Sequence, residues 1–107
     1  MHITPFTEIY GDGPILRVIN FLILNDEFDH SMTDITESSG VGYSTLKLFL
    51  PILEANGIVK HVRTIGKAEM YCLNKTNPVV KKLKELYWTV TGKAVHEALE
   101  EEKVLEN

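Results

Sequence analysis

The chain has 107 residues, of which 44% are hydrophobic, and its formal net charge at pH 7 is −4. This length is typical of one domain, and the composition favours a folded chain over a disordered one. No apolar run approaches the roughly 18 residues that a membrane-spanning helix needs. The first residues lack the basic segment and long apolar run of a signal peptide. We therefore expect a single domain, residues 1–107, located in the cytoplasm, with no membrane partner.

Charge is distributed unevenly along the chain. Residues 1–39 carry one basic and seven acidic side chains, residues 40–93 carry nine basic and three acidic ones, and residues 94–107 carry one basic and five acidic ones. Attraction to phosphate depends on local surface charge, so the basic middle section matters more for nucleic-acid binding than the negative total. The alternative interpretation is a chance fluctuation in charge.

The N-terminal part predicts an arm followed by a buried helix. Residues 1–12 are weakly patterned and contain Pro5 and Gly11, which favours a short arm. A helix is predicted to start at Pro14, because proline at the first helical position loses no hydrogen bond. Apolar residues cover more than half of its circumference, which predicts burial both in the domain and against a second copy of the chain.

The next section predicts two helices joined by a tight turn that contains two glycines. The first helix is expected at 32–39, where Ser31 and Asp34 have the spacing of a capping box. The second helix is expected at 43–56 and should end at Gly57. This arrangement is a helix-turn-helix, whose second helix can enter the major groove of DNA.

The second of these helices has one apolar and one open face. Helical spacing predicts that its buried residues are Leu46, Phe49, Leu50 and Leu53. Ser44, Lys47 and Leu48 fall on the other side, together with Pro51. Because Pro51 removes the hydrogen bond to the carbonyl of Lys47, we expect a bend there, and only the first two turns should lie deep in a groove.

After Gly57 the pattern changes to that of a β-hairpin and then to a long helix. Residues 58–64 and 69–73 are the predicted strands. Asn77, followed by proline, predicts the helix start. One apolar stripe is expected to seal the core: Val79, Leu83, Leu86 and Val90.

A second apolar stripe on the long helix predicts a dimer interface. Large apolar residues that face away from a core usually mark a contact surface. The residues assigned to this interface are Trp88, Val95 and Leu99 of the long helix, Ile15 of the first helix and Phe6 of the arm.

The order of these elements resembles the winged helix-turn-helix superfamily, and most of all small archaeal or bacterial transcriptional regulators of the MarR-like and ArsR-like kind. The resemblance covers about residues 14–90 and is carried by DITESSGVGYSTLKLFLPILEANGIV, by the hairpin and by YCLNKTNPVVKKL. It implies a mostly helical α+β fold with a two- or three-stranded wing sheet and a long C-terminal helix. Residues 1–12 would form the arm, 14–76 the helix-turn-helix and wing, and 77–107 the dimerisation helix with its acidic tail.

The resemblance also implies sequence-specific binding of double-stranded DNA by a homodimer that regulates transcription, as a repressor. The recognition helix, residues 43–56, would lie in the major groove, and the wing, residues 58–73, on phosphate or in the minor groove. The implied DNA-binding residues are Tyr43, Ser44, Thr45, Lys47 and Leu48 on the helix, and Lys60, Arg63 and Lys67 on the wing. Leu48 suits a thymine methyl group.

Other kinds of site find little support in the residues. The four histidines are scattered and Cys72 is the single cysteine, so no metal-ligand spacing is present and no metal or cofactor is predicted. A metal site shared across a dimer would need Cys72 or His96, and a nucleophilic Cys72 would need a nearby base. We expect no enzyme. The open alternative is a winged-helix module that binds protein instead of DNA.

Overall fold

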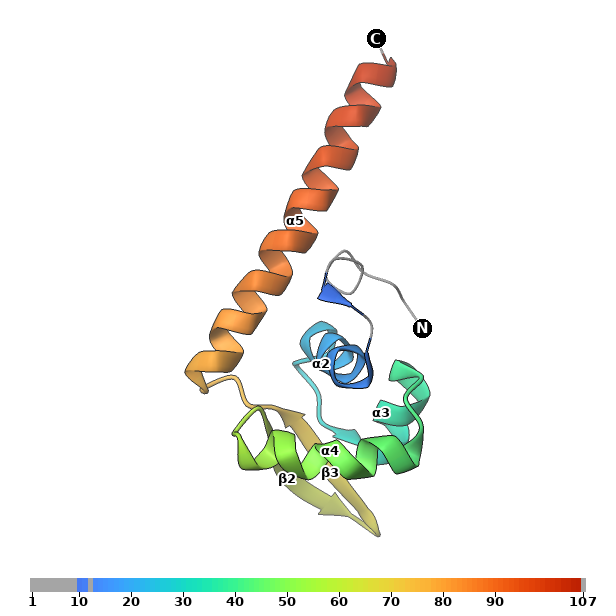
Figure 1. Ribbon diagram of the computed structural model, residues 1–107, viewed down its shortest axis with the longest axis vertical. Helices are drawn as coiled ribbons and strands as arrows, with labels where there is room; N and C mark the ends of the chain where they lie inside the picture. The colour runs from blue at the N-terminus through green and yellow to red at the C-terminus, as the bar shows by residue number, and fades with distance from the viewer. Residues whose placement is uncertain (1–9, 12, 107) are drawn as a thin grey trace.

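The computed structural model describes Tyr10, Gly11 and residues 13–106, and for residues 93–106 it describes the backbone alone. The helices are α2 (Pro14–Leu24), α3 (Met32–Ser39), α4 (Tyr43–Ala55) and α5 (Pro78–Glu106), and the strands are β1 (His30–Ser31), β2 (Val59–Ile65) and β3 (Ala68–Leu73). Figure 1 shows α2, α3 and α4 gathered beside the sheet, while the C-terminal half of α5 extends beyond them. The predicted α+β, mostly helical fold with a wing sheet is confirmed.

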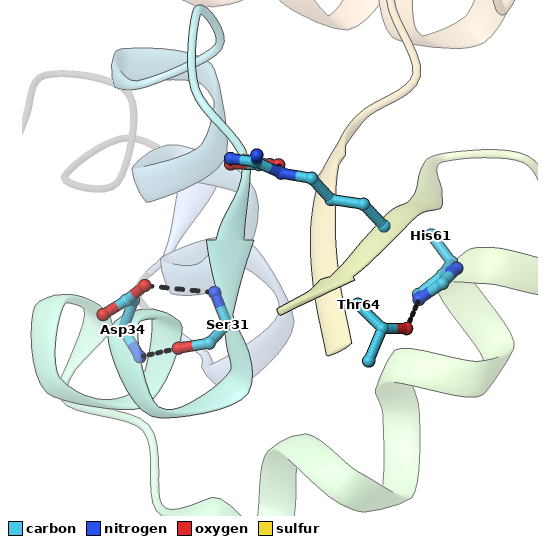
Figure 2. Close-up of polar contacts among 6 residues, drawn as sticks. Ser31, Asp34, His61 and Thr64 are labelled. Atoms are coloured by element: carbon cyan, nitrogen blue, oxygen red, sulfur yellow. Dashed lines mark hydrogen bonds and ion pairs between the residues drawn. The ribbon is translucent and has the colours of Figure 1, made fainter. Parts of the chain in front are cut away.

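The two helices α3 and α4 form the predicted helix-turn-helix. The hydroxyl of Ser31 accepts a hydrogen bond from the Asp34 N–H at 3.1 Å, and the Asp34 carboxylate accepts one from the Ser31 N–H at 3.1 Å (Figure 2). This capping box starts α3 at the predicted residue. The helix ends at Gly40, whose φ of 72° lies in the left-handed region that favours glycine.

The wing is a three-stranded antiparallel sheet in the order β1-β3-β2. The short strand β1 pairs with β3, and β2 pairs with β3 in the predicted hairpin. The β2–β3 register shifts between His61 and Arg63, so Val62 is the extra residue of a β-bulge. Bulges bend a strand and re-aim neighbouring side chains.

The hydrophobic core lies where the three short helices, the base of the wing and the start of α5 meet. It receives the four residues predicted for α4, and its buried members are Val18, Ile19, Leu22, Ile23, Ile35, Val41, Leu46, Phe49, Leu50, Leu53, Val59, Leu73, Val80 and Tyr87. This packing fixes one side of α4 and leaves the opposite side open. Across the described part of the chain, no helix combines the length and the apolar character that crossing a membrane requires.

The helix α5 packs on the core through a different face from the predicted one. Val80 and Tyr87 are fully buried and Leu83 packs against them, whereas Val79 is 61% exposed and Leu86 is 39% exposed. The predicted sealing stripe is therefore wrong at Val79 and Leu86. Both stripes have helical spacing, so periodicity alone does not distinguish them.

The side chain of Asn77 connects the start of α5 to the rest of the fold. Its Oδ1 accepts a hydrogen bond from the Val79 N–H at 2.8 Å, which caps the helix. Its Nδ2 donates to the Gly57 carbonyl at 2.9 Å, and so ties the start of α5 to the end of α4. These two bonds hold the first turn of α5 against the segment that follows α4, next to the buried Val80.

Candidate nucleic-acid interface

The N-terminal half of α4 presents the open face that the sequence predicted. Tyr43 is 52% exposed and Leu48 is 76% exposed, and Ser44, Thr45 and Lys47 are exposed as well. None of these five side chains belongs to the buried core. These five side chains are therefore accessible to a ligand, because the opposite side of the helix packs against the core.

The helix α4 remains helical on both sides of Pro51 and ends at Ala55. Pro51 is exposed and lies beside Lys47, Glu54 and Tyr71, which together line a small hollow of about 70 Å³. The region after the second turn therefore offers a carboxylate and a tyrosine next to the predicted reading face. A carboxylate there repels phosphate, which favours contact through the first two turns.

Three lysines extend the basic surface from α4 to the wing. Lys47 is on α4, Lys60 is on β2, and Lys67 stands beside Gly66 in the turn at the wing tip; all three are exposed. Within the described range, no carboxylate lies at ion-pair distance from any of them. Their charges are therefore available to an anionic partner.

Arg63 differs from these lysines, because its guanidinium is already paired. Its Nε lies 2.6 Å and its second amino nitrogen 3.1 Å from the two carboxylate oxygens of Asp29. The hydrogen bond from Arg63 holds the pKa of Asp29 below its usual value, and the same bond raises the pKa of Arg63. The bulge at Val62 lies next to Arg63 in β2, and Arg63 precedes Lys67 at the wing tip by four residues. Arg63 therefore lies on the wing, and its pairing with Asp29 was not predicted from the sequence.

A polar cluster braces the wing. The His61 ring pairs with the Glu69 carboxylate, and the Thr64 hydroxyl donates to Glu69 at 3.2 Å. The Thr64 hydroxyl also lies 3.4 Å from the His61 ring nitrogen (Figure 2). The His61 ring also packs edge-on against Tyr71, with ring centres 5.7 Å apart. Burial raises the pKa of the Tyr71 hydroxyl, and the nearby Glu54 and Glu69 charges raise it further. These contacts tie both strands of the hairpin together.

The residues predicted for a dimer interface are described in part. Ile15 is 45% exposed and Trp88 is 49% exposed. Residues of a dimer interface are expected to be exposed when a single copy of the chain is considered. Phe6 lies outside the described residues, and so do the side chains of Val95 and Leu99, whose backbone belongs to α5.

The structure adds a basic hollow beside Trp88 that the sequence reasoning missed. It has a volume of about 590 Å³ and is lined by Lys75, Lys81, Lys84, Glu85, Trp88 and Thr89. The Lys84 ammonium also pairs with Asp26. The sequence signal was the lysine-rich start of α5, which is equally typical of a solvated helix surface.

The described residues contain no group of three or more His, Cys, Asp or Glu side chains that could hold a metal ion. Cys72 is partly buried on β3. The exposed groups of α4 and the wing include ammonium, hydroxyl and apolar groups, together with the carboxylates of Glu54 and Glu69.

Several solved structures resemble this chain. Rv0081 from M. tuberculosis is 25% identical, with a TM-score of 0.56 over 78% of this chain and 81% of its own. The homodimeric winged helix-turn-helix DNA-binding domain of Mb0332 from Mycobacterium bovis, a possible ArsR-family transcriptional regulator, is 18% identical, with a TM-score of 0.58 over 87% and 81%. ZitR from Lactococcus lactis, solved in complex with DNA, is 16% identical, with a TM-score of 0.56 over 84% and 66%.

These likenesses show that the chain has the winged helix-turn-helix fold. No protein-family model and no curated protein sequence matches it.

Proposed function

We propose that this protein binds double-stranded DNA in a sequence-specific manner and regulates transcription as a homodimeric repressor. The observation that carries the proposal is the exposed N-terminal half of α4, held by a fully packed opposite face and continued onto the wing by unpaired lysines. A helix of this kind fits the major groove of B-DNA, whose width admits one α-helix. Bound over a promoter, such a dimer would block access by the transcription machinery.

The side chains of α4 divide into base-reading and positioning roles. Lys47 can donate to the acceptor edge of guanine, and Leu48 can contact a thymine methyl group. Ser44 and Thr45 can donate to bases or to phosphate, and Tyr43 stands at the start of the helix, where phosphate contacts usually fix register.

The wing contributes contacts that carry no sequence information. Lys67 at the tip and Lys60 on β2 would approach phosphate, and each neutralised phosphate would add to the salt dependence of binding. Arg63 would contribute only after exchanging Asp29 for phosphate. The DNA complex of ZitR and the DNA-binding domain of Mb0332 support this assignment by analogy of fold.

We also propose that the homodimer forms through α5 and α2. Trp88 and Ile15 supply the exposed apolar surface, and Val95, Leu99 and Phe6 are assigned to the same interface from the sequence. The homodimeric state of Mb0332 supports this proposal. Two-fold symmetry would present two copies of α4 to a near-palindromic site.

The test begins with selection of bound duplexes from a random pool, followed by titration of the selected site and of random DNA. Lys47→Ala should cost roughly 1–3 kcal/mol on the selected site and much less on random DNA, if Lys47 reads a base. Lys67→Ala should weaken binding to the selected site and to random DNA by the same factor, and should reduce the salt dependence of binding. The matched control is Lys82→Ala, because Lys82 is an exposed lysine on α5, away from α4 and the wing. Failure of the wild type to enrich any sequence would contradict the proposal.

A second candidate function is supported by the apolar content of α4. Leu48 is 76% exposed and Ile52, one turn later, is 59% exposed, so this face could bind an apolar helix of another protein. The same titration separates the two functions, because a protein-binding module would show neither enrichment of a sequence nor salt-dependent binding to duplexes.

A further inference from the structure

The helix α4 and the wing meet at a corner that holds several titratable side chains. Tyr71 of β3 lies in this corner and lines the small hollow of about 70 Å³ together with Lys47 and Glu54 of α4. The ring of His61, on β2, packs edge-on against Tyr71 with ring centres 5.7 Å apart. Figure 2 shows His61 on the side of β2 nearer the ribbon of α4. These side chains and the ion-pair partner of His61 define the α4–wing corner: Lys47, Glu54, His61, Glu69 and Tyr71.

In the proposed complex with duplex DNA, a phosphate backbone crosses this corner. The helix α4 would lie in the major groove, and the wing would lie on phosphate or in the minor groove beside it. One sugar-phosphate strand separates the two grooves, so it has to pass over the surface between α4 and the wing. The α4–wing corner would therefore meet phosphate, although the sequence assigned only Lys47 of its residues to DNA.

The ring of His61 has one nitrogen engaged and one nitrogen open. Its Nε2 atom pairs with the Glu69 carboxylate and lies 3.4 Å from the Thr64 hydroxyl. Among the residues that the structure describes, none lies at hydrogen-bond distance from the other ring nitrogen, Nδ1. A protonated imidazole donates from both nitrogens, whereas a neutral one donates from only one. The side chains of His61 and Glu69 are 37% and 51% exposed, so a phosphate can reach the ring.

The carboxylate of Glu69 makes the charge of His61 important for DNA binding. Beside a neutral imidazole, this carboxylate would face the backbone as an unbalanced negative charge and repel it. Beside an imidazolium, it is neutralised, and Nδ1 offers a charge-assisted hydrogen bond to phosphate. The other charged or titratable groups around the ring are Lys60 and Arg63 in β2, Tyr71 in β3, and Tyr43, Lys47 and Glu54 in α4. Histidine is the only one of these side-chain types whose charge ordinarily changes between about pH 5 and pH 8.

We propose that His61 is a further DNA-binding residue, which is protonated in the complex and bridges the Glu69 carboxylate and a backbone phosphate. This bridge presupposes the proposed binding of duplex DNA and adds a contact where the two grooves meet. Formation of the complex then takes up a proton on His61. The state that binds more protons is favoured at low pH, so the affinity for duplexes of any sequence rises as the pH falls, by at most about tenfold per pH unit for one proton.

Titration of one random duplex at pH 6 and at pH 8, at constant salt, tests the bridge. The wild type should bind roughly tenfold more tightly at pH 6. His61→Gln should remove most of this difference, because glutamine keeps a hydrogen-bond donor but cannot carry the charge. Glu69→Gln should raise the affinity at pH 8 and change it little at pH 6, where the imidazolium already neutralises the carboxylate.

Two control variants separate the bridge from general effects of pH. Lys67→Ala, at the wing tip, should weaken binding by the same factor at both pH values. His30→Gln removes a histidine whose ring packs against Phe21 of α2, outside the α4–wing corner, and it should keep the pH dependence of the wild type. Urea unfolding at both pH values checks that each variant is folded.

Nuclear magnetic resonance of the His61 ring measures its charge directly. At pH 7, addition of the duplex should move the ring signals of the wild type towards those of the charged form. A wild type that binds equally at both pH values, or a His61→Gln variant that keeps the pH dependence, would overturn the bridge and leave the proposed function in place. A wild type that binds no duplex at either pH would remove the proposed function and the bridge with it.

Discussion

Arg63 faces two competing partners, because its planar guanidinium matches both a carboxylate and a phosphate. Asp29 already occupies two of its donors, at 2.6 Å and 3.1 Å. The Arg63 side chain is nevertheless 59% exposed, so a phosphate could approach it. Asp29 therefore neutralises part of the positive charge that the wing would present to DNA. Removal of the Asp29 carboxylate should make the Arg63 guanidinium available to phosphate.

We expect Asp29→Ala to raise the affinity for duplex DNA of any sequence, because the released guanidinium can then bind phosphate. Arg63→Ala should weaken binding less than Lys67→Ala does, since Arg63 must first leave Asp29. A salt titration of the three variants on one random duplex measures both effects. Equal affinities of wild type and Asp29→Ala would indicate that Arg63 does not meet DNA.

The same pair predicts how stability depends on pH. The hydrogen bond from Arg63 lowers the pKa of Asp29 in the folded protein below the usual 3.8. The stabilisation is therefore complete above about pH 3.8 and is lost as the pH falls through the lower, folded-state pKa. Asp29→Asn should destabilise the protein at neutral pH, and this difference should shrink in acid. Urea unfolding measures it, and the pH dependence should be absent in an Arg63→Ala background.

Sequence reasoning could not predict that Arg63 is paired with Asp29. Its partner Asp29 is 34 residues away and precedes a strand of only two residues. The bulge at Val62 has no signal in the local pattern of β-branched and basic residues. By contrast, the exposure of Lys47 and Leu48 follows from helical periodicity alone, and those predictions match the structure.

At the scale of the helices, local chemistry predicted where α3 begins and ends and which face α4 buries, but not which face α5 buries. The capping box at Ser31 and the left-handed Gly40 fix α3 at both ends, and both signals are readable in the sequence. The face of α5 depends instead on packing against elements that are distant in sequence, and Asn77 ties its start to Gly57. Tyr87 was overlooked because a tyrosine is compatible with either a buried or an exposed position.

The corrected face of α5 gives a stability prediction with an internal control. Tyr87 is 1% exposed, so Tyr87→Ala should cost about 3–5 kcal/mol, as expected for loss of a large buried ring. Val79 lies on the originally predicted stripe but is 61% exposed, so Val79→Ala should change stability by less than about 0.5 kcal/mol. Chemical denaturation measures both. A larger loss of stability from Val79→Ala than from Tyr87→Ala would instead support the stripe predicted from the sequence.

For the molecule as a whole, charge and shape are arranged along the same axis. The fold measures 57 × 27 × 23 Å, and α5 accounts for its long dimension. The unpaired lysines lie on α4 and the wing at one end, while the glutamate-rich turns lie at the far end of α5. A chain with a net charge of −4 can therefore present a basic surface to phosphate while its acidic end stays remote.

In the proposed homodimer, DNA affinity would depend on assembly. A dimer binds two half-sites at once, so the second contact occurs at high effective concentration and strengthens binding without new contacts. Trp88→Glu with Leu99→Glu places charges on the proposed dimer interface. We expect this variant to sediment as a monomer at micromolar concentration, at which we expect the wild type to sediment as a dimer. The variant should keep the base preference of the wild type on a single half-site and lose the gain from a second one. A variant that remains dimeric, or a monomer that binds the paired site as tightly as the wild type, would contradict the proposed assembly.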